Sequence, residues 1–178
     1  MPIQHFTLIV DGTDLQSEPS IDALFEAGCD DATVGRADGV QYVDFDREAE
    51  SLGEAIISAV RDVEKVDGVQ VTRVADAGLV SMTDIAARLG RTRESVRLLV
   101  TGARGPGGFP APVTDPRGRY RLWRWSDVTR WLTTRLGDDT LPDDHLVTAI
   151  NASLELRRYQ HEFSGARRSS LGALAGLS

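Results

Sequence analysis

The residues with the clearest chemical potential are arginines that gather in one part of an acidic chain. Residues 80–135 hold 11 Lys or Arg against 4 Asp or Glu, a net charge of +7, whereas the whole chain of 178 residues carries -7. Residues 1–79 carry -12. Because guanidinium groups bind phosphate oxygens and guanine edges, this basic block indicates either a nucleic-acid-binding module or a solvated surface without a partner.

The sequence contains none of the common catalytic or metal-binding patterns. The single cysteine, Cys29, excludes an internal disulfide and leaves too few thiolates for a structural zinc site, and His5, His145 and His161 share no metal-ligand spacing. The glycines at 102–108 follow an expected helix rather than a strand, which argues against a dinucleotide-binding loop. We therefore expect no enzyme activity, no cofactor and no metal.

Composition and hydropathy place the chain among folded cytoplasmic proteins. Hydrophobic residues make up 41% and charged residues 26% of the sequence, which is typical of soluble domains. No apolar run reaches the roughly 18 residues that a membrane helix needs, and the first residues lack the basic and apolar regions of a secretory signal. We expect no membrane partner.

Two short helices are expected to position the arginines of the basic block. Ser81 or Thr83 can cap the first helix and Thr92 the second, and Gly90 permits the positive φ of a tight turn between them. The second helix should bury Val96 and the pair Leu99/Val100. Its exposed positions are expected to be Arg91, Thr92, Arg93, Glu94 and Arg97.

The stretch after these helices is expected to form a basic-tipped hairpin and one more helix. A glycine- and proline-rich loop spans 102–112, and a turn at 115–118 leads into an expected strand over 119–123. Such a hairpin beside an exposed basic helix is typical of a wing. A helix capped by Ser126 should follow, and its inward residues are expected to be Val128, Trp131 and Leu132.

Residues 80–135 resemble the MerR-like winged helix-turn-helix group, and within it the AlpA or excisionase-like DNA-binding proteins. The matching residues are Thr83, Ile85, Ala86, Leu89, Gly90, Ser95, Val96, Phe109, Pro110, Pro112, the Arg/Trp strand that follows, and Asp127, Val128, Trp131 and Leu132. The sequence departs from the family in its glycine-rich insert at 102–108, which bears on the position of the wing. It also lacks a long C-terminal coiled coil, which bears on MerR-style dimerisation.

The resemblance implies a bacterial regulator that places its second helix in the major groove of double-stranded DNA. There Thr92 would face the bases, and Arg93 and Arg97 could each bind the O6/N7 pair of a guanine. Glu94 could accept from a cytosine amino group or orient an arginine, and the second role is favoured. The phosphate contacts of this helix would come from Arg91 and Ser95.

The hairpin would add contacts to the DNA backbone or the minor groove. The resemblance assigns these to Arg117 and Arg119, whereas Arg121 and Arg124 either contact DNA or pack beside tryptophans. The tryptophans themselves could stack on a single strand or fill the small core, and the core is favoured. They are Trp123, Trp125 and Trp131.

Residues 1–76 are predicted to form an acidic, ferredoxin-like domain with the order β-α-β-β-α-β. The strands are expected over 4–10, 32–36, 40–45 and 69–74. One helix is expected over 20–27, and a second is expected to begin just after Ser51. Ser20 can cap the first helix, in which Ile21, Leu24 and Phe25 recur at helical spacing. The acidic residues match no EF-hand spacing and favour a solvated surface over a cation site, and Cys29 is expected to be buried and inert.

The predicted α+β chain therefore has four parts. They are the ferredoxin-like domain at 1–76, the winged helix-turn-helix at 79–136, a C-terminal helix at 141–163 and a flexible tail at 164–178. A linker over 137–142 should precede the C-terminal helix, which Asp143 can cap.

The C-terminal helix has an apolar stripe that packs either on the same chain or on a second copy. A homodimer is favoured, because palindromic sites suit twofold dimers. The residues of this stripe are Leu146, Val147, Ile150, Leu154 and Tyr159.

Two functions fit these patterns. The first is a sequence-specific, double-stranded DNA-binding transcriptional regulator whose acidic domain binds a small ligand or a protein. The alternative is an antitoxin-like or adaptor protein whose acidic N-terminal domain binds a protein partner while the winged helix autoregulates.

Overall fold

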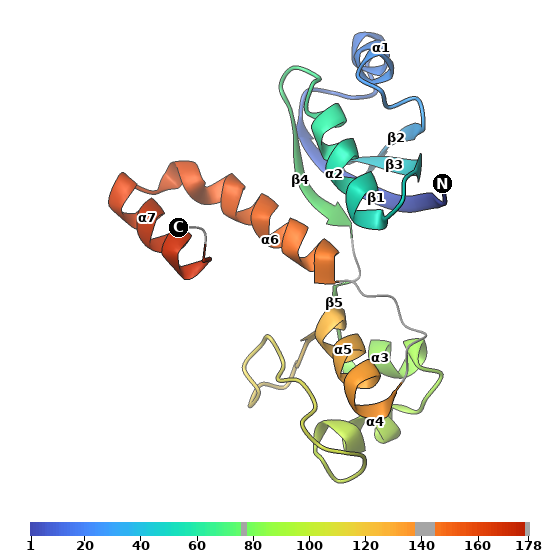
Figure 1. The fold of residues 1–178 in the computed structure, drawn as a ribbon, viewed down its shortest axis with the longest axis vertical. Coiled ribbons are helices and arrows are strands. Elements are labelled where there is room, and N and C mark those ends of the chain that lie inside the picture. The colour runs from blue at the N-terminus through green and yellow to red at the C-terminus, as the bar shows by residue number, and fades with distance from the viewer. Residues whose placement is uncertain (76–77, 138–144, 177–178) are drawn as a thin grey trace. The chain divides into compact units, whose positions relative to one another are not determined.

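The computed structural model describes residues 1–75, 78–137 and 145–176 of this mixed α+β chain (Figure 1). The chain divides into two compact units. The N-terminal unit comprises residues 1–75 with 149–178, and the central unit comprises 76–148. No helix in the described segments is long and apolar enough to cross a membrane.

The N-terminal unit is built on a four-stranded antiparallel sheet with the strand order β2-β3-β1-β4. The elements follow one another in the predicted order, with strand ends that shift by up to three residues. Their bounds are β1 (Ile3–Gly12), α1 (Glu18–Glu26), β2 (Ala32–Ala37), β3 (Val40–Glu48), α2 (Leu52–Val63) and β4 (Val69–Ala75).

The core of this unit lies between the sheet and α2, which packs on β1, β3 and β4. Leu8, Val43 and Phe45 alternate along the strands and are buried, and Ile56 and Val63 supply the apolar face of α2. Each such side chain stabilises the fold by about 1.5–3 kcal/mol when it leaves water.

Helix α1 differs from the prediction. Ser17 rather than Ser20 is the N-cap residue, and Ser20 is buried inside the helix. Leu24 is 3% exposed, but Ile21 is 51% exposed and Phe25 is 68% exposed, so only one of the three apolar residues at helical spacing enters the core. The reason is helical geometry: Ser20 and Leu24, four residues apart, form the inward face and turn Ile21 and Phe25 outward.

The C-terminal helices are α6 (His145–Tyr159) and α7 (Gly165–Leu174), with a short 3-10 turn at Gln160–Glu162 between them. Apart from Gly137, the expected linker and the expected cap Asp143 lie outside the described residues. The expected flexible tail instead holds helix α7, none of whose residues is buried. Its alanine, leucine and arginine content favours a helix locally.

Helix α6 packs on its own chain, where its polar side chains cover the outer edge of β4. The Asn151 side-chain amide donates to the Val74 carbonyl at 3.0 Å and accepts from the Val74 N–H at 2.7 Å. In the same way, the Val71 N–H donates to the Glu64 carboxylate and the Arg157 guanidinium donates to the Val71 carbonyl, both at 2.9 Å. An edge strand that would otherwise expose backbone groups is thus closed by side chains.

The residues of the predicted apolar stripe of α6 divide between burial and exposure. Leu154 is 7% exposed and Val147, within the central unit, is 6% exposed. Leu146 and Tyr159, in contrast, are 48% and 40% exposed. The stripe therefore packs on its own chain along only part of its length.

The central unit packs three helices around a tryptophan-rich core. Its elements are β5 (Leu79–Val80), α3 (Met82–Arg88), α4 (Arg93–Val100), β6 (Trp123–Arg124) and α5 (Trp125–Leu136), and β5 pairs antiparallel with β6. Trp123 is fully buried, and Trp125 and Trp131 are each 6% exposed. The prediction that the tryptophans fill the core is confirmed, and no indole face is left open for stacking on a nucleic-acid base.

Two details of the central unit correct the predictions. The expected strand over 119–123 is a strand only at Trp123, and residues 113–122 form a loop that Val113 closes by donating to the Leu122 carbonyl at 2.8 Å. Prolines at 112 and 116 cannot donate to a ladder there. Ser126 is not a cap, because α5 begins one residue earlier and buries it.

Candidate nucleic-acid interface

Side-chain caps hold the start of both helices that carry the candidate site. Ser81 accepts from the Asp84 N–H at 3.2 Å while the Asp84 carboxylate accepts from the Ser81 N–H at 2.8 Å, a reciprocal capping box. The Ser81 hydroxyl also donates to the Asp84 carboxylate at 2.7 Å, and this bond and the one from the Ser81 N–H lower the pKa of Asp84. The Thr92 hydroxyl accepts from the Ser95 N–H at 3.1 Å, so the predicted cap of the second helix is confirmed.

The turn between α3 and α4 is closed by two backbone hydrogen bonds. Gly90 donates to Ala87 at 3.2 Å and Arg91 donates to Ala86 at 2.8 Å, the pattern of a Schellman motif. Gly90 has a φ of 59°, which confirms the predicted positive φ. Because Ala86 is small and 4% exposed, α4 can cross α3 closely at this point.

Burial fixes which side of α4 faces outward. Val96 is fully buried and Leu99 is 4% exposed, so both face the core. Ser95 is half-buried at the boundary. The predicted exposed positions are all exposed in the structure: Arg91, Thr92, Arg93, Glu94 and Arg97.

On that face Arg97 is already paired with Glu94. The guanidinium Nε donates to Glu94 Oε2 at 2.9 Å and Nη2 donates to Oε1 at 2.7 Å, and both side chains remain largely exposed. The Arg97 hydrogen bonds lower the pKa of Glu94, and Glu94 in turn raises the pKa of Arg97. Glu94 is thus bonded to an arginine in the structure, which is the contact that the favoured of its two predicted roles requires.

Arg93 differs from Arg97 in that its donors are not engaged. Among the described residues, neither its guanidinium nor that of Arg91 makes a hydrogen bond or an ion pair. Arg93 and Arg91 therefore offer complete N–H forks on the exposed face of α4.

The loop over 113–122 does not present its arginines as a uniform basic tip. Arg117 binds Asp115 through two N–H groups at 3.1 and 3.0 Å, which lowers the pKa of that carboxyl. Arg119 is exposed beside Tyr120, 5.8 Å from the ring centroid. The half-buried Arg121 lies at the same distance from the Trp123 ring, so it packs beside a tryptophan.

The end of the glycine-rich insert and the residues just after it are bonded to the tryptophan core. The buried indole N–H of Trp131 donates to the Gly107 carbonyl and that of Trp123 donates to the Pro110 carbonyl, both at 3.0 Å. Phe109 packs between them, with its ring centroid 4.9 Å from that of Trp131. Gly107 of the insert and Pro110 after it thus supply the acceptors that buried indole groups require.

Sequence reasoning missed a hollow of about 300 Å³ between α5 and the loop residues Gly108 and Pro110. Asp127, Arg130 and Thr134 line it at helical spacing, together with Arg135. Arg130 Nε donates to His145 Nε2 at 3.0 Å. The positions three and seven residues after Asp127 could have indicated this polar face once the inward residues of the helix had been assigned.

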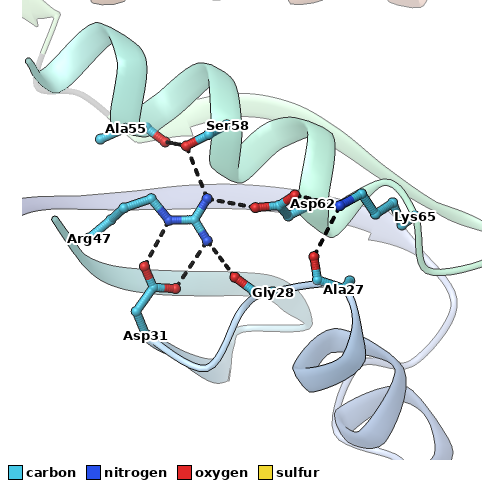
Figure 2. Close-up of polar contacts among 8 residues, drawn as sticks. All are labelled: Ala27, Gly28, Asp31, Arg47, Ala55, Ser58, Asp62 and Lys65. Atoms are coloured by element: carbon cyan, nitrogen blue, oxygen red, sulfur yellow. Dashed lines mark hydrogen bonds and ion pairs between the residues drawn. The ribbon is translucent and has the colours of Figure 1, made fainter. Parts of the chain in front are cut away.

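Sequence reasoning also missed a charge cluster in the N-terminal unit (Figure 2). Arg47 is 7% exposed and makes five hydrogen bonds, one for each N–H of its guanidinium. Two go to Asp31, and the others go to Asp62, Ser58 and the Gly28 carbonyl, at 2.8–3.1 Å. Because every donor is used, this arginine holds the sheet, α2 and the loop after α1 together and has no donor left for a ligand.

Burial and charge act in opposite directions within this cluster. Burial lowers the pKa of Arg47, but the hydrogen bonds and charges of Asp31 and Asp62 outweigh it, so the pKa is raised. Burial likewise raises the pKa of Asp62, and the hydrogen bonds from Lys65 and Arg47 outweigh it, so the pKa of Asp62 is lowered. Burial raises the pKa of the neighbouring Cys29 thiol to about 11, and the prediction that this cysteine is buried is confirmed.

The acidic residues of the N-terminal unit do not converge on a cation. Over residues 1–75, 78–137 and 145–176, no group of three or more His, Cys, Asp or Glu side chains is arranged to hold a metal. Comparison with known proteins gives no match: no family model, no curated protein and no solved structure matches the chain.

Proposed function

We propose that this protein is a sequence-specific, double-stranded DNA-binding transcriptional regulator that places α4 in the major groove. The observation that carries the proposal is the exposed arginine face of α4, which is fixed by Val96 and Leu99 on the opposite side. A short helix held in this way after a tight turn, with base-reading side chains at its N-terminal end, has the geometry of a recognition helix.

We also propose a specific fold for each of the two units. Residues 79–136 form a MerR- or AlpA-like winged helix-turn-helix, in which the loop over 113–122 is the wing. Residues 1–76 form a ferredoxin-like unit. The helix pair joined at Gly90 supports the first assignment, and the strand order β2-β3-β1-β4 supports the second.

The geometry of α4 divides the work among its arginines. Arg93 has a complete fork and binds a guanine edge, which contributes about 1–3 kcal/mol of discrimination. Arg97 keeps Nη1 for DNA while Glu94 holds its other two nitrogens. Arg91 and Ser95 bind phosphates, and they set the register of the helix without reading sequence.

The wing contributes less to binding than the sequence indicates. Arg119 contacts the DNA backbone, whereas Arg117 must first exchange Asp115 for a phosphate. Arg121 stays beside Trp123. The acidic N-terminal unit points away from the duplex, because its charge opposes that of the phosphates.

Selection of bound duplexes from a random pool tests the proposal. We expect the full chain to enrich one short motif, and Arg93→Ala to blur at least one position of it. Arg61→Ala, an exposed arginine on α2, is the matched control and should leave the motif unchanged. Recovery of random sequence, or of no duplex at all, would refute sequence-specific binding.

One observation favours the alternative function as an antitoxin-like or adaptor protein. Helix α1 of the acidic unit exposes Ile21 and Phe25, an apolar pair of the kind found at protein interfaces. If that alternative holds, DNA binding by the central unit regulates the gene of the protein itself, and α1 binds a partner of different sequence.

A further inference from the structure

Helix α1 has a complete face that its own chain leaves uncovered. The residues of this face recur at helical spacing and are all exposed. Ile21 and Phe25 form its apolar centre, with 51% and 68% of their surface exposed. Acidic side chains surround this pair: Glu18, Asp22 and Glu26. A partner for this face must bring both apolar side chains and positive charge.

Helix α7 has the complementary composition. Arg167 and Arg168 come first, Leu171 and Leu174 follow one and two turns later, and the helix contains no acidic residue. No residue of α7 is buried, and Leu174 is 84% exposed. Leu171 is half-buried, whereas Leu174 and both arginines are exposed, so α7 presents a leucine at its end and two arginines to solvent.

We propose that α1 of one copy of this chain binds α7 of a second copy. Ile21 and Phe25 pack on Leu171 and Leu174, and the arginines of α7 face the acidic side chains that flank the apolar pair. The occupant is a second copy because α1 is exposed in the very chain that contains its own α7. Exchange in both directions about a twofold axis uses both contacts and closes a dimer.

The helix expected to form the dimer is engaged elsewhere, which favours this interface. Leu154 is buried and Asn151 and Arg157 are bonded to β4, so α6 closes the sheet of its own chain. The inference does not rest on DNA binding, because every residue it uses lies in the N-terminal unit.

Sedimentation velocity of the full chain, over a wide range of chain concentration and without DNA, tests the interface. We expect the mass to rise with concentration from 19.4 kDa to a plateau at twice that value, and added salt to weaken the association. Phe25→Ala should raise the dissociation constant by about tenfold. Ile57→Ala, an exposed residue of α2, is the matched control and should leave it unchanged.

A charge exchange makes the test specific to these two helices. Arg167→Glu combined with Arg168→Glu should abolish the dimer, and adding Asp22→Arg and Glu26→Arg to the same chain should restore it. Arg158→Glu, an exposed arginine of α6, controls for charge alone. Circular dichroism confirms that each variant is folded.

Two results would overturn the proposal. One is a chain that stays at the mass of a single copy at every concentration, which would leave the face of α1 to a protein of different sequence. The other is a dimer that survives both Phe25→Ala and the arginine reversals.

Discussion

Arg47 in the N-terminal unit and the arginines of α4 in the central unit differ in how their donors are used. In the N-terminal unit, Arg47 is buried, and all five N–H groups of its guanidinium donate to acceptors of the same unit. In the central unit, Arg91 and Arg93 are exposed, and Arg97 is only partly engaged. The same side chain is therefore a structural clamp where its donors are satisfied and a candidate ligand contact where they are not.

The contrast shows why net charge alone does not locate a site. The N-terminal unit is acidic, yet its most constrained charged residue is a cation. The central unit is basic, yet Glu94 and Asp115 already hold two of its nine candidate DNA-binding residues. Accounting for each guanidinium donor separates the two roles.

The largest effect should come from removing the clamp. Arg47→Met leaves Asp31 without its ion-pair partner and Asp62 with Lys65 alone, and we expect the free energy of unfolding to fall by about 3–5 kcal/mol. Urea denaturation measures this change. Arg61→Met, on the exposed side of α2, should change stability by less than about 0.5 kcal/mol. Equal effects of the two substitutions would remove the distinction between clamp and surface.

The next effect concerns the exposed arginines. Arg93→Ala should weaken binding to the selected duplex by about 1–3 kcal/mol and relax base preference at one position. Arg117→Ala should weaken binding to all sequences alike and by less, since Asp115 already holds that guanidinium. Fluorescence anisotropy with matched and mismatched duplexes measures both. Identical behaviour of the two variants would refute the division between base and backbone contacts.

The turn that aims α4 should respond to substitution at Gly90. Its φ of 59° is unfavourable for a side chain, so we expect Gly90→Ala to destabilise the fold by about 1–2 kcal/mol. Gly90→Asn should cost less, because asparagine tolerates this conformation better. Thermal denaturation of the two variants gives the comparison, and a loss that is the same for both would count against backbone strain as the cause.

Acid should weaken the clamp by protonating Asp62. Because the folded state lowers the pKa of Asp62 from its ordinary 3.8, the unfolded chain binds the proton more readily. The stabilisation by Asp62 is therefore complete above that value and is lost as the pH falls through the folded pKa. Urea denaturation at a series of pH values should show Asp62→Asn flattening this loss. The exposed Asp30→Asn should leave the loss unchanged.

Local signals carried the predictions that hold. Gly90 and Thr92 are determined by backbone geometry and capping within a few residues, and alternation along the strands determines which side chains enter the sheet core. Such features can be predicted from the sequence because the residues that determine them lie close together along the chain.

Long-range contacts explain the features that the sequence did not indicate. Arg47 is clamped by residues 16 and 15 positions away, and Arg157 bonds to a residue 93 positions away. Ile21 has the spacing of a core residue but lies on the outer face of α1, because Ser20 and Leu24 form the inward face. No local pattern distinguishes these outcomes, since they depend on which surfaces meet in the folded chain.

The most direct test of the central claim is the affinity of the full chain for duplex DNA as a function of salt concentration. Binding through the arginine face of α4 releases counterions, so the logarithm of the binding constant should fall linearly with the logarithm of salt concentration, with a slope of about -0.9 for each phosphate contacted. Arg91→Ala should reduce that slope by about one contact. An affinity that does not change with salt, or no duplex binding at the lowest salt, would contradict the account.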